Sequence, residues 1–142
     1  MKQQVLLDTG PLVALLNRGD RYHQWARNHW GQIAPPLFTC EAVLAEACFL
    51  VRRFAGGQPA VLELVRRGIL DVSFRLTEET DAVFRLLKKY RDVPTSLADA
   101  CMVRMAEQHP EGVVFTLDTD FSIYRKNGRQ TIPTLMPPVE PA

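Results

Sequence analysis

Two short apolar runs in this chain each lead to an aspartate, and this pattern limits the folds that the chain can adopt. Residues 5–7 are followed by Asp8, and residues 113–117 are followed by Asp118. Short apolar runs of this kind are typical of buried strands. In a parallel α/β sheet the carboxyl ends of the strands share one edge, and ligands bind there. We therefore expect both aspartates to lie at one edge of such a sheet.

Strand patterns and helix patterns alternate along the chain, which predicts an α/β fold whose mostly parallel sheet is covered on both faces. Gly-Pro, Gly-Gly and Asn-Gly pairs mark the breaks between the elements. The expected strands cover residues 5–8, 33–38, 69–76, 113–117 and 132–135. The expected helices cover residues 11–16, 20–30, 39–54, 59–67, 77–91, 96–106 and 121–126.

The composition is typical of one soluble globular domain. Of the 142 residues, 46% are hydrophobic and 23% are charged, and a chain of this length buries roughly 68–70% of its unfolded surface. The net charge of +1 gives no general attraction to a polyanion, so nucleic-acid binding would depend on local basic clusters. We expect one domain over residues 1–136 and a Pro-rich, disordered tail over residues 137–142.

No apolar stretch is long enough for a signal-peptide core or a membrane span, so we expect a cytoplasmic protein without membrane association. The three cysteines, Cys40, Cys48 and Cys101, form no C-x-x-C pair. In a cytosolic chain this pattern indicates reduced thiols that are mostly buried.

Two further acids stand on predicted helices. Glu46 lies in the middle of an apolar helical segment, where a glutamate is rarely buried unless it has a partner. Asp99 is the third helical residue of a capping box that begins at Ser96. Each acid alone also has a structural explanation: Asp8 and Asp118 are good turn residues, Asp99 is a helix cap, and Glu46 fits a narrow polar stripe.

Several carboxylates at one sheet edge repel one another, and folding does not favour that arrangement unless a positive charge lies among them. A hard divalent cation that takes oxygen ligands, Mg²⁺ or Mn²⁺, is the obvious candidate. The four acids together therefore predict a metal site more strongly than any one of them does.

The acids also stand in motifs that follow one another in a characteristic order. These motifs are Leu-Asp-Thr-Gly-Pro-Leu-Val-Ala-Leu-Leu at 7–16, Asp20-x-x-His23, Glu46 after a brief strand, Thr-Ser-Leu-Ala-Asp-Ala at 95–100, and Phe-Thr-Leu-Asp-Thr-Asp-Phe at 115–121. With them the chain resembles the PIN-domain family, and within it the VapC-type toxin ribonucleases of bacterial toxin–antitoxin pairs. The likeness spans about residues 4–135.

The resemblance implies a three-layer α/β/α fold with a central parallel sheet of four or five strands. It also implies an endoribonuclease that hydrolyses RNA phosphodiester bonds with Mg²⁺ or Mn²⁺. The catalytic residues would be Asp8, Glu46, Asp99 and Asp118. Asp8, Asp99 and Asp118 would bind the metal, and Glu46 would hold or orient water. Hydrogen bonds from three further residues could orient these acids, namely Thr9, Thr116 and Asp120.

The implied partners are RNA, a small antitoxin protein and a second copy of the chain in a homodimer. An arginine of the antitoxin could pair with the acids in place of the metal. Arg125, Lys126 and Arg129 are the expected phosphate contacts because they follow the fourth acidic motif.

Two alternatives remain open. One is a non-catalytic PIN-fold module that binds RNA or protein without cutting it. The other is another metal-dependent phosphohydrolase, such as a phosphatase of the haloacid-dehalogenase type. That class expects Asp-x-Asp at the first strand, and the sequence Asp8-Thr9-Gly10 lacks the second aspartate.

Overall fold

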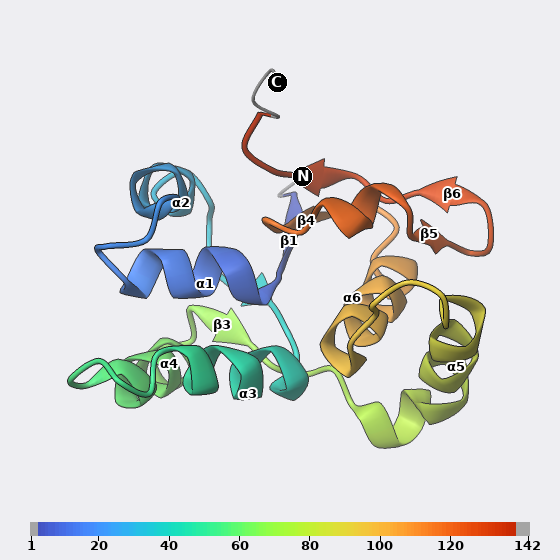
Figure 1. Cartoon of the computed structure of the whole chain (residues 1–142), viewed down its shortest axis with the longest axis horizontal. Coiled ribbons are helices and arrows are strands. Elements are labelled where there is room, and N and C mark those ends of the chain that lie inside the picture. Colours follow the sequence, from blue (N-terminus) through green and yellow to red (C-terminus); the bar gives the residue numbers. More distant parts are fainter. Residues whose placement is uncertain (1–2, 139–142) are drawn as a thin grey trace.

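A five-stranded parallel sheet forms the centre of the computed structural model, which describes residues 3–138 (Figure 1). The strand order is β3-β2-β1-β4-β7, and all neighbouring strands are parallel. The predicted parallel sheet is therefore confirmed. Its strands are β1 (Gln4–Leu7), β2 (Leu37–Phe38), β3 (Leu70–Asp71), β4 (Gly112–Phe115) and β7 (Thr134–Leu135).

Helices cover both faces of this sheet, as the alternating pattern predicts. In Figure 1, α1, α2 and α4 lie to the left of the sheet and α5 and α6 lie to the right. The helices are α1 (Thr9–Leu16), α2 (His23–Trp30), α3 (Glu41–Leu50), α4 (Gly57–Arg66), α5 (Leu76–Lys89) and α6 (Leu97–Gln108). A 3-10 turn, η1 (Thr119–Ser122), and a hairpin of β5 (Arg125–Lys126) and β6 (Gln130–Thr131) follow β4.

The side chains of the two central strands alternate between two hydrophobic clusters. Leu6 and Val114 pack into the cluster with α5 and α6, whereas Leu7 and Phe115 pack into the cluster with α1 and α4. All four are fully buried. The register pairs Leu6 with Val114 and Leu7 with Phe115, so residues that face each other across the strands face the same layer. This alternation establishes the three-layer arrangement.

Helix α3 belongs to both clusters. Val43 packs on the α5 and α6 side, whereas Ala47 and Val51 pack on the side of α1 and α4. The helix contacts both α1 and α6. It therefore lies across the carboxyl edge of the sheet and brings Glu46 between the two layers.

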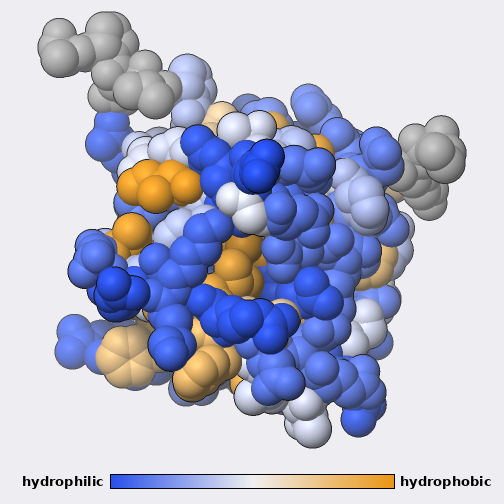
Figure 2. Space-filling view, turned by 90° about the vertical axis from the view of Figure 1, so that its right-hand side faces the viewer, coloured by the Kyte–Doolittle hydropathy of each residue, from blue (hydrophilic) through white to orange (hydrophobic). Residues whose placement is uncertain are grey.

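The outer surface of α5 is largely polar. Val83 and Leu86 are buried on its inner side, and Figure 2 shows a mostly hydrophilic face with scattered apolar groups over this part of the molecule. In residues 3–138 no helix combines the length and hydropathy needed to cross a lipid bilayer. The predicted tail reaches residues 139–142, which lie outside the described part of the chain.

Three local predictions were wrong. Thr39 does not cap α3, because its hydroxyl donates a hydrogen bond to the Leu7 carbonyl at 2.8 Å and Cys40 takes the cap position. The strand expected over residues 69–76 is confined to Leu70–Asp71. The helix expected over residues 121–126 is replaced by the 3-10 turn and the first hairpin strand, although the predicted Asn127-Gly128 turn is present, with positive φ at both residues.

Candidate active site

The four acids predicted from the sequence line one open cleft of about 440 Å³ at the carboxyl edge of the sheet. Asp8 follows β1, Asp118 follows β4, Glu46 lies on α3 and Asp99 lies in the first turn of α6. Four separate elements therefore bring these carboxylates together. Ligands of parallel α/β sheets bind at this edge.

Thr116 joins the two aspartates that follow the strands. Its hydroxyl donates a hydrogen bond to Asp8 Oδ2 at 2.7 Å and accepts one from the Asp118 backbone N–H at 2.9 Å. Thr116 has no exposed surface, and the Asp8 backbone N–H donates to the Phe115 carbonyl at 3.0 Å. One buried hydroxyl thus fixes the side chain of one acid and the backbone of the other.

Asp118 and Asp120 have different positions. Asp118 lines the cleft, and its Oδ1 accepts a hydrogen bond from the Asp120 backbone N–H at 2.9 Å. Asp120 is not among the residues that line the cleft. Its contribution to Asp118 is a backbone hydrogen bond rather than a second carboxylate ligand.

Asp99 is held by the predicted capping box. Its Oδ2 accepts a hydrogen bond from the Ser96 backbone N–H, and its own N–H donates to Ser96 Oγ, both at 3.0 Å. The side chain still lines the cleft, with 9% of the residue exposed. The cap therefore positions the carboxylate for the cleft.

Glu46 is bound across the boundary between two helices. Thr9 of α1 donates its hydroxyl hydrogen to Glu46 Oε2 at 3.0 Å. Glu46 is exposed rather than buried. Its hydrogen-bond partner is the Thr9 hydroxyl, which also lies at the cleft. Thr9 and Thr116 both orient acids, as the sequence predicted.

Gly10 is a cleft residue that the sequence analysis did not single out. A β-carbon at this position would meet the Leu117 side chain at 3.0 Å, which is tighter than ordinary van der Waals contact. A residue without a side chain lets the start of α1 approach the segment before Asp118. In the sequence, the Gly10-Pro11 pair is explained by a turn alone, so it does not reveal that Gly10 lies close to Leu117.

Burial and mutual repulsion disfavour the charged forms of the acids. Burial, with smaller contributions from the charges of Asp99 and Asp118, raises the pKa of Asp8 to about 6, against the lowering effect of the hydrogen bond from Thr116. Burial also raises the pKa of Asp99, with a contribution from the Glu46 charge, and that of Asp118, with a contribution from Asp99. Such shifts are typical of functional sites.

Of the basic residues that follow the fourth acidic motif, Lys126 does not have the predicted role of a phosphate contact. Lys126 is buried and donates to the Pro110 carbonyl at 3.1 Å, before the start of β4 and away from the carboxyl edge. The Arg125 Nη1 atom donates to the carbonyls of Ser122, Ile123 and Tyr124. The prediction was wrong for Lys126, and Arg125 is engaged at the end of the 3-10 turn.

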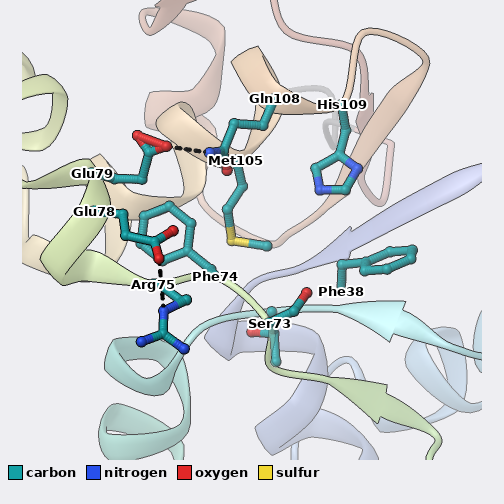
Figure 3. A pocket seen from close by; sticks show the side chains of 10 residues that line it. Phe38, Ser73, Phe74, Arg75, Glu78, Glu79, Met105, Gln108 and His109 are labelled. Atoms are coloured by element: carbon teal, nitrogen blue, oxygen red, sulfur yellow. Dashed lines mark hydrogen bonds and ion pairs between the residues drawn. The ribbon is translucent and has the colours of Figure 1, made fainter.

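A smaller cavity of about 100 Å³ lies between β2, α5 and α6 (Figure 3). Its charged residues are paired with their neighbours: Arg75 contacts Glu78 at 3.1 Å, and Gln108 donates to Glu79 at 2.5 Å (Figure 3). His109 is also in the lining, and burial lowers its pKa. These internal pairs and the small volume make this cavity a weaker candidate than the acidic cleft.

The profile of the PIN domain family matches residues 5–127, a range that contains all four acids. This chain belongs to the PIN domain family. No curated protein sequence matches it at a significant level. Among solved structures, it is similar to the crystal structure of Mycobacterium tuberculosis VapC20, described as a toxin that cleaves the sarcin-ricin loop. The two share 23% sequence identity with a TM-score of 0.73 over 84% of this chain and 94% of that chain, which shows a common fold.

The PIN domain cleft offers the oxygen ligands that a hard divalent cation binds. Carboxylate and hydroxyl oxygens suit Mg²⁺ and Mn²⁺. A bound cation would favour the charged form of Asp8, whose pKa is raised by burial and, to a smaller extent, by the neighbouring acids. Within residues 3–138 no group of three or more His, Cys, Asp or Glu side chains is arranged to hold a metal ion. Mg²⁺ keeps several of its waters when protein-bound, so carboxylates around a cleft suit it through water as well as directly.

The stability of the metal-free PIN domain should fall as pH rises through the range in which Asp8 loses its proton. The folded state binds this proton more tightly than the unfolded chain, because the pKa is raised from 3.8 to about 6. The stabilisation is complete below the lower value and lost above the higher one, and Asp99 and Asp118 act in the same direction. The difference for Asp8 corresponds to about 3 kcal/mol.

Urea unfolding in EDTA at a series of pH values tests this expectation. The Asp8→Asn variant should show a clearly shallower decline, whereas Asp81→Asn, at an exposed position of α5, should follow the wild type. A decline of the same slope in Asp8→Asn and wild type would contradict the assignment to Asp8.

Thr116→Val should destabilise the fold by about 2–3 kcal/mol, because it removes a hydrogen bond to Asp8 and leaves the Asp118 N–H without its acceptor. Thr116→Ser keeps the hydroxyl and should cost only about 1 kcal/mol for the lost methyl group. Urea unfolding of both variants in EDTA measures the difference. Equal free energies of unfolding for the two variants would show that the hydroxyl is not what matters.

Proposed function

We propose that this PIN domain is an endoribonuclease that hydrolyses RNA phosphodiester bonds with Mg²⁺ or Mn²⁺ and acts as the toxin of a toxin–antitoxin pair. The observation that carries the proposal is the arrangement of four carboxylates around one cleft, of which three have a raised pKa. The fold shared with VapC20, described as a toxin that cleaves the sarcin-ricin loop, supports this proposal.

Asp8, Asp99 and Asp118 would hold the cation in this proposal, because their side chains surround the cleft and are restrained by neighbouring groups. When bound, Mg²⁺ or Mn²⁺ supplies positive charge for the scissile phosphate and makes water a better nucleophile at neutral pH. Glu46, which Thr9 restrains, would orient the attacking water through its carboxylate.

The shape of the cleft favours RNA whose backbone is accessible. It is open to solvent and formed by the ends of four elements, so a single strand or a loop can enter it. Sequence-specific recognition of RNA uses such unpaired regions more often than duplexes. A single-stranded or looped substrate is therefore part of the proposal.

A small antitoxin is the proposed partner of this chain. The chain itself is proposed to be cytoplasmic and to form a homodimer. An arginine from the partner could pair with two carboxylates of the cleft in place of the cation. The apolar surface available beside the cleft is at the end of α3, where Phe49 is 59% and Leu50 is 51% exposed next to Glu46. Leu12 and Val43 are fully buried, so the partner would bind at the end of α3 rather than against α1.

Cleavage of RNA should require Mg²⁺ or Mn²⁺ and should fall at least roughly 100-fold in Asp8→Asn, because the variant loses a charged oxygen ligand. The measurement is cleavage of a labelled RNA, with a DNA of the same sequence and a phosphomonoester as the alternative substrates. Activity on the phosphomonoester alone would favour the other phosphohydrolase class.

Asp81→Asn is the matched control, since it removes an exposed carboxylate far from the cleft on α5. It should keep wild-type cleavage. Activity that survives EDTA, or full activity in Asp8→Asn, would reject the metal-dependent mechanism. The absence of any cleavage with either metal would favour the non-catalytic module.

Co-expression with the product of an adjacent small reading frame should yield a stable complex in which RNA cleavage is suppressed. Size-exclusion chromatography and the cleavage assay report the two effects. Phe49→Ser at the exposed end of α3 should weaken the complex without lowering the cleavage by the isolated protein. A freely expressed, non-toxic chain with no such partner would count against the toxin assignment and leave the nuclease proposal intact.

A further inference from the structure

Two cysteine side chains meet on the side of the sheet that α5 and α6 cover. Cys40 is the N-cap residue of α3, and Cys101 lies in the first half of α6. Their exposed fractions are 1% and 2%, both side chains belong to the same buried cluster, and both line the same cavity. Both are free thiols. The third cysteine, Cys48, is half-buried and packs into the opposite cluster.

A cavity gives small molecules access to this thiol pair. Its volume is about 220 Å³, and Cys40 and Cys101 both line it. The remaining lining is mostly apolar and includes Leu76 and Leu97, which are 39% and 45% exposed. The cavity therefore borders the molecular surface, and its volume admits a small oxidant such as hydrogen peroxide.

The cysteine pair connects the two helices that supply acids to the cleft. Helix α3 carries Glu46, and α6 carries Asp99 two residues before Cys101. A disulfide holds its sulfurs about 2.05 Å apart, closer than two free thiols can approach each other, and both cysteines are free here. Bond formation would therefore pull the start of α3 and the first turns of α6 toward each other and displace acids that the cleft requires.

We propose that Cys40 and Cys101 are a redox-sensitive pair whose oxidation to a disulfide lowers the nuclease activity of the adjacent cleft. One thiol reacts with hydrogen peroxide to give a sulfenic acid and water, and the second thiol displaces the sulfenic oxygen as a second water. The two thiols lose two electrons and the peroxide gains them. A dithiol reductant restores both thiols and becomes a disulfide itself. The effect on activity rests on the proposed nuclease function, whereas the disulfide does not.

The first test is the formation of the bond in the full-length protein. After treatment with hydrogen peroxide, unfolding and alkylation, one of the three cysteines should react, and peptide mapping should join residues 40 and 101. Cys48→Ala should form the same bond, and Cys40→Ala and Cys101→Ala should not. Alanine keeps these buried positions small and apolar. If Cys40→Ala or Cys101→Ala does not fold, the mapping of wild type and Cys48→Ala still decides whether the disulfide forms.

The second test compares RNA cleavage before oxidation, after oxidation and after reduction with dithiothreitol. Cleavage by the wild type should fall roughly 10- to 100-fold on oxidation, since displacements near 1 Å have effects of this size, and it should return on reduction. Cys40→Ala should be insensitive to the same treatment. Alkylation of all three thiols after oxidation would overturn the pairing, and a disulfide without loss of cleavage would overturn the regulation. If no form cleaves RNA, the nuclease proposal fails, and the mapping still decides the disulfide.

Discussion

The burial of neighbouring carboxylates at the carboxyl edge of the sheet is the constraint on which the arrangement of the site depends. Asp8 is 5% exposed with a pKa near 6, so its burial as an anion opposes folding. The structure offsets this with fixed donors: the Thr116 hydroxyl for Asp8, the Ser96 capping box for Asp99, and the Thr9 hydroxyl for Glu46. The Ser96 donor is a backbone N–H, Thr9 directly follows Asp8, and Thr116 stands two residues before Asp118. Function and local structure therefore use the same hydrogen bonds.

The positions of the acids could be predicted because local patterns determine them. An aspartate after a buried parallel strand must lie at the carboxyl edge, and a capping box fixes the third residue of its helix. The same reasoning identified Thr9, which directly follows Asp8, and Thr116, which stands two residues before Asp118. The family resemblance added the chemistry and the partners, which local patterns do not contain.

The predictions that were wrong concern contacts between residues distant in sequence. Thr39 has the chemistry of a helix cap, yet its hydroxyl binds the Leu7 carbonyl on the neighbouring strand. Lys126 has the charge of a phosphate ligand, yet it lies buried against the Pro110 carbonyl. In both cases a local propensity competes with a tertiary partner that the sequence pattern does not reveal. The contact between Cys40 and Cys101 is hidden for the same reason.

The register of the two central strands has a consequence for how errors in folding would appear. β1 and β4 have four residues each, and the pairing of Leu7 with Phe115 sets Asp8 beside Thr116. A slip of one residue would turn Leu6 and Leu7 to the wrong layers and would also separate the acid from its hydroxyl. A misaligned chain would thus lose its core and its cleft in the same event. For the proposed nuclease, incorrectly folded copies would be inert rather than indiscriminate.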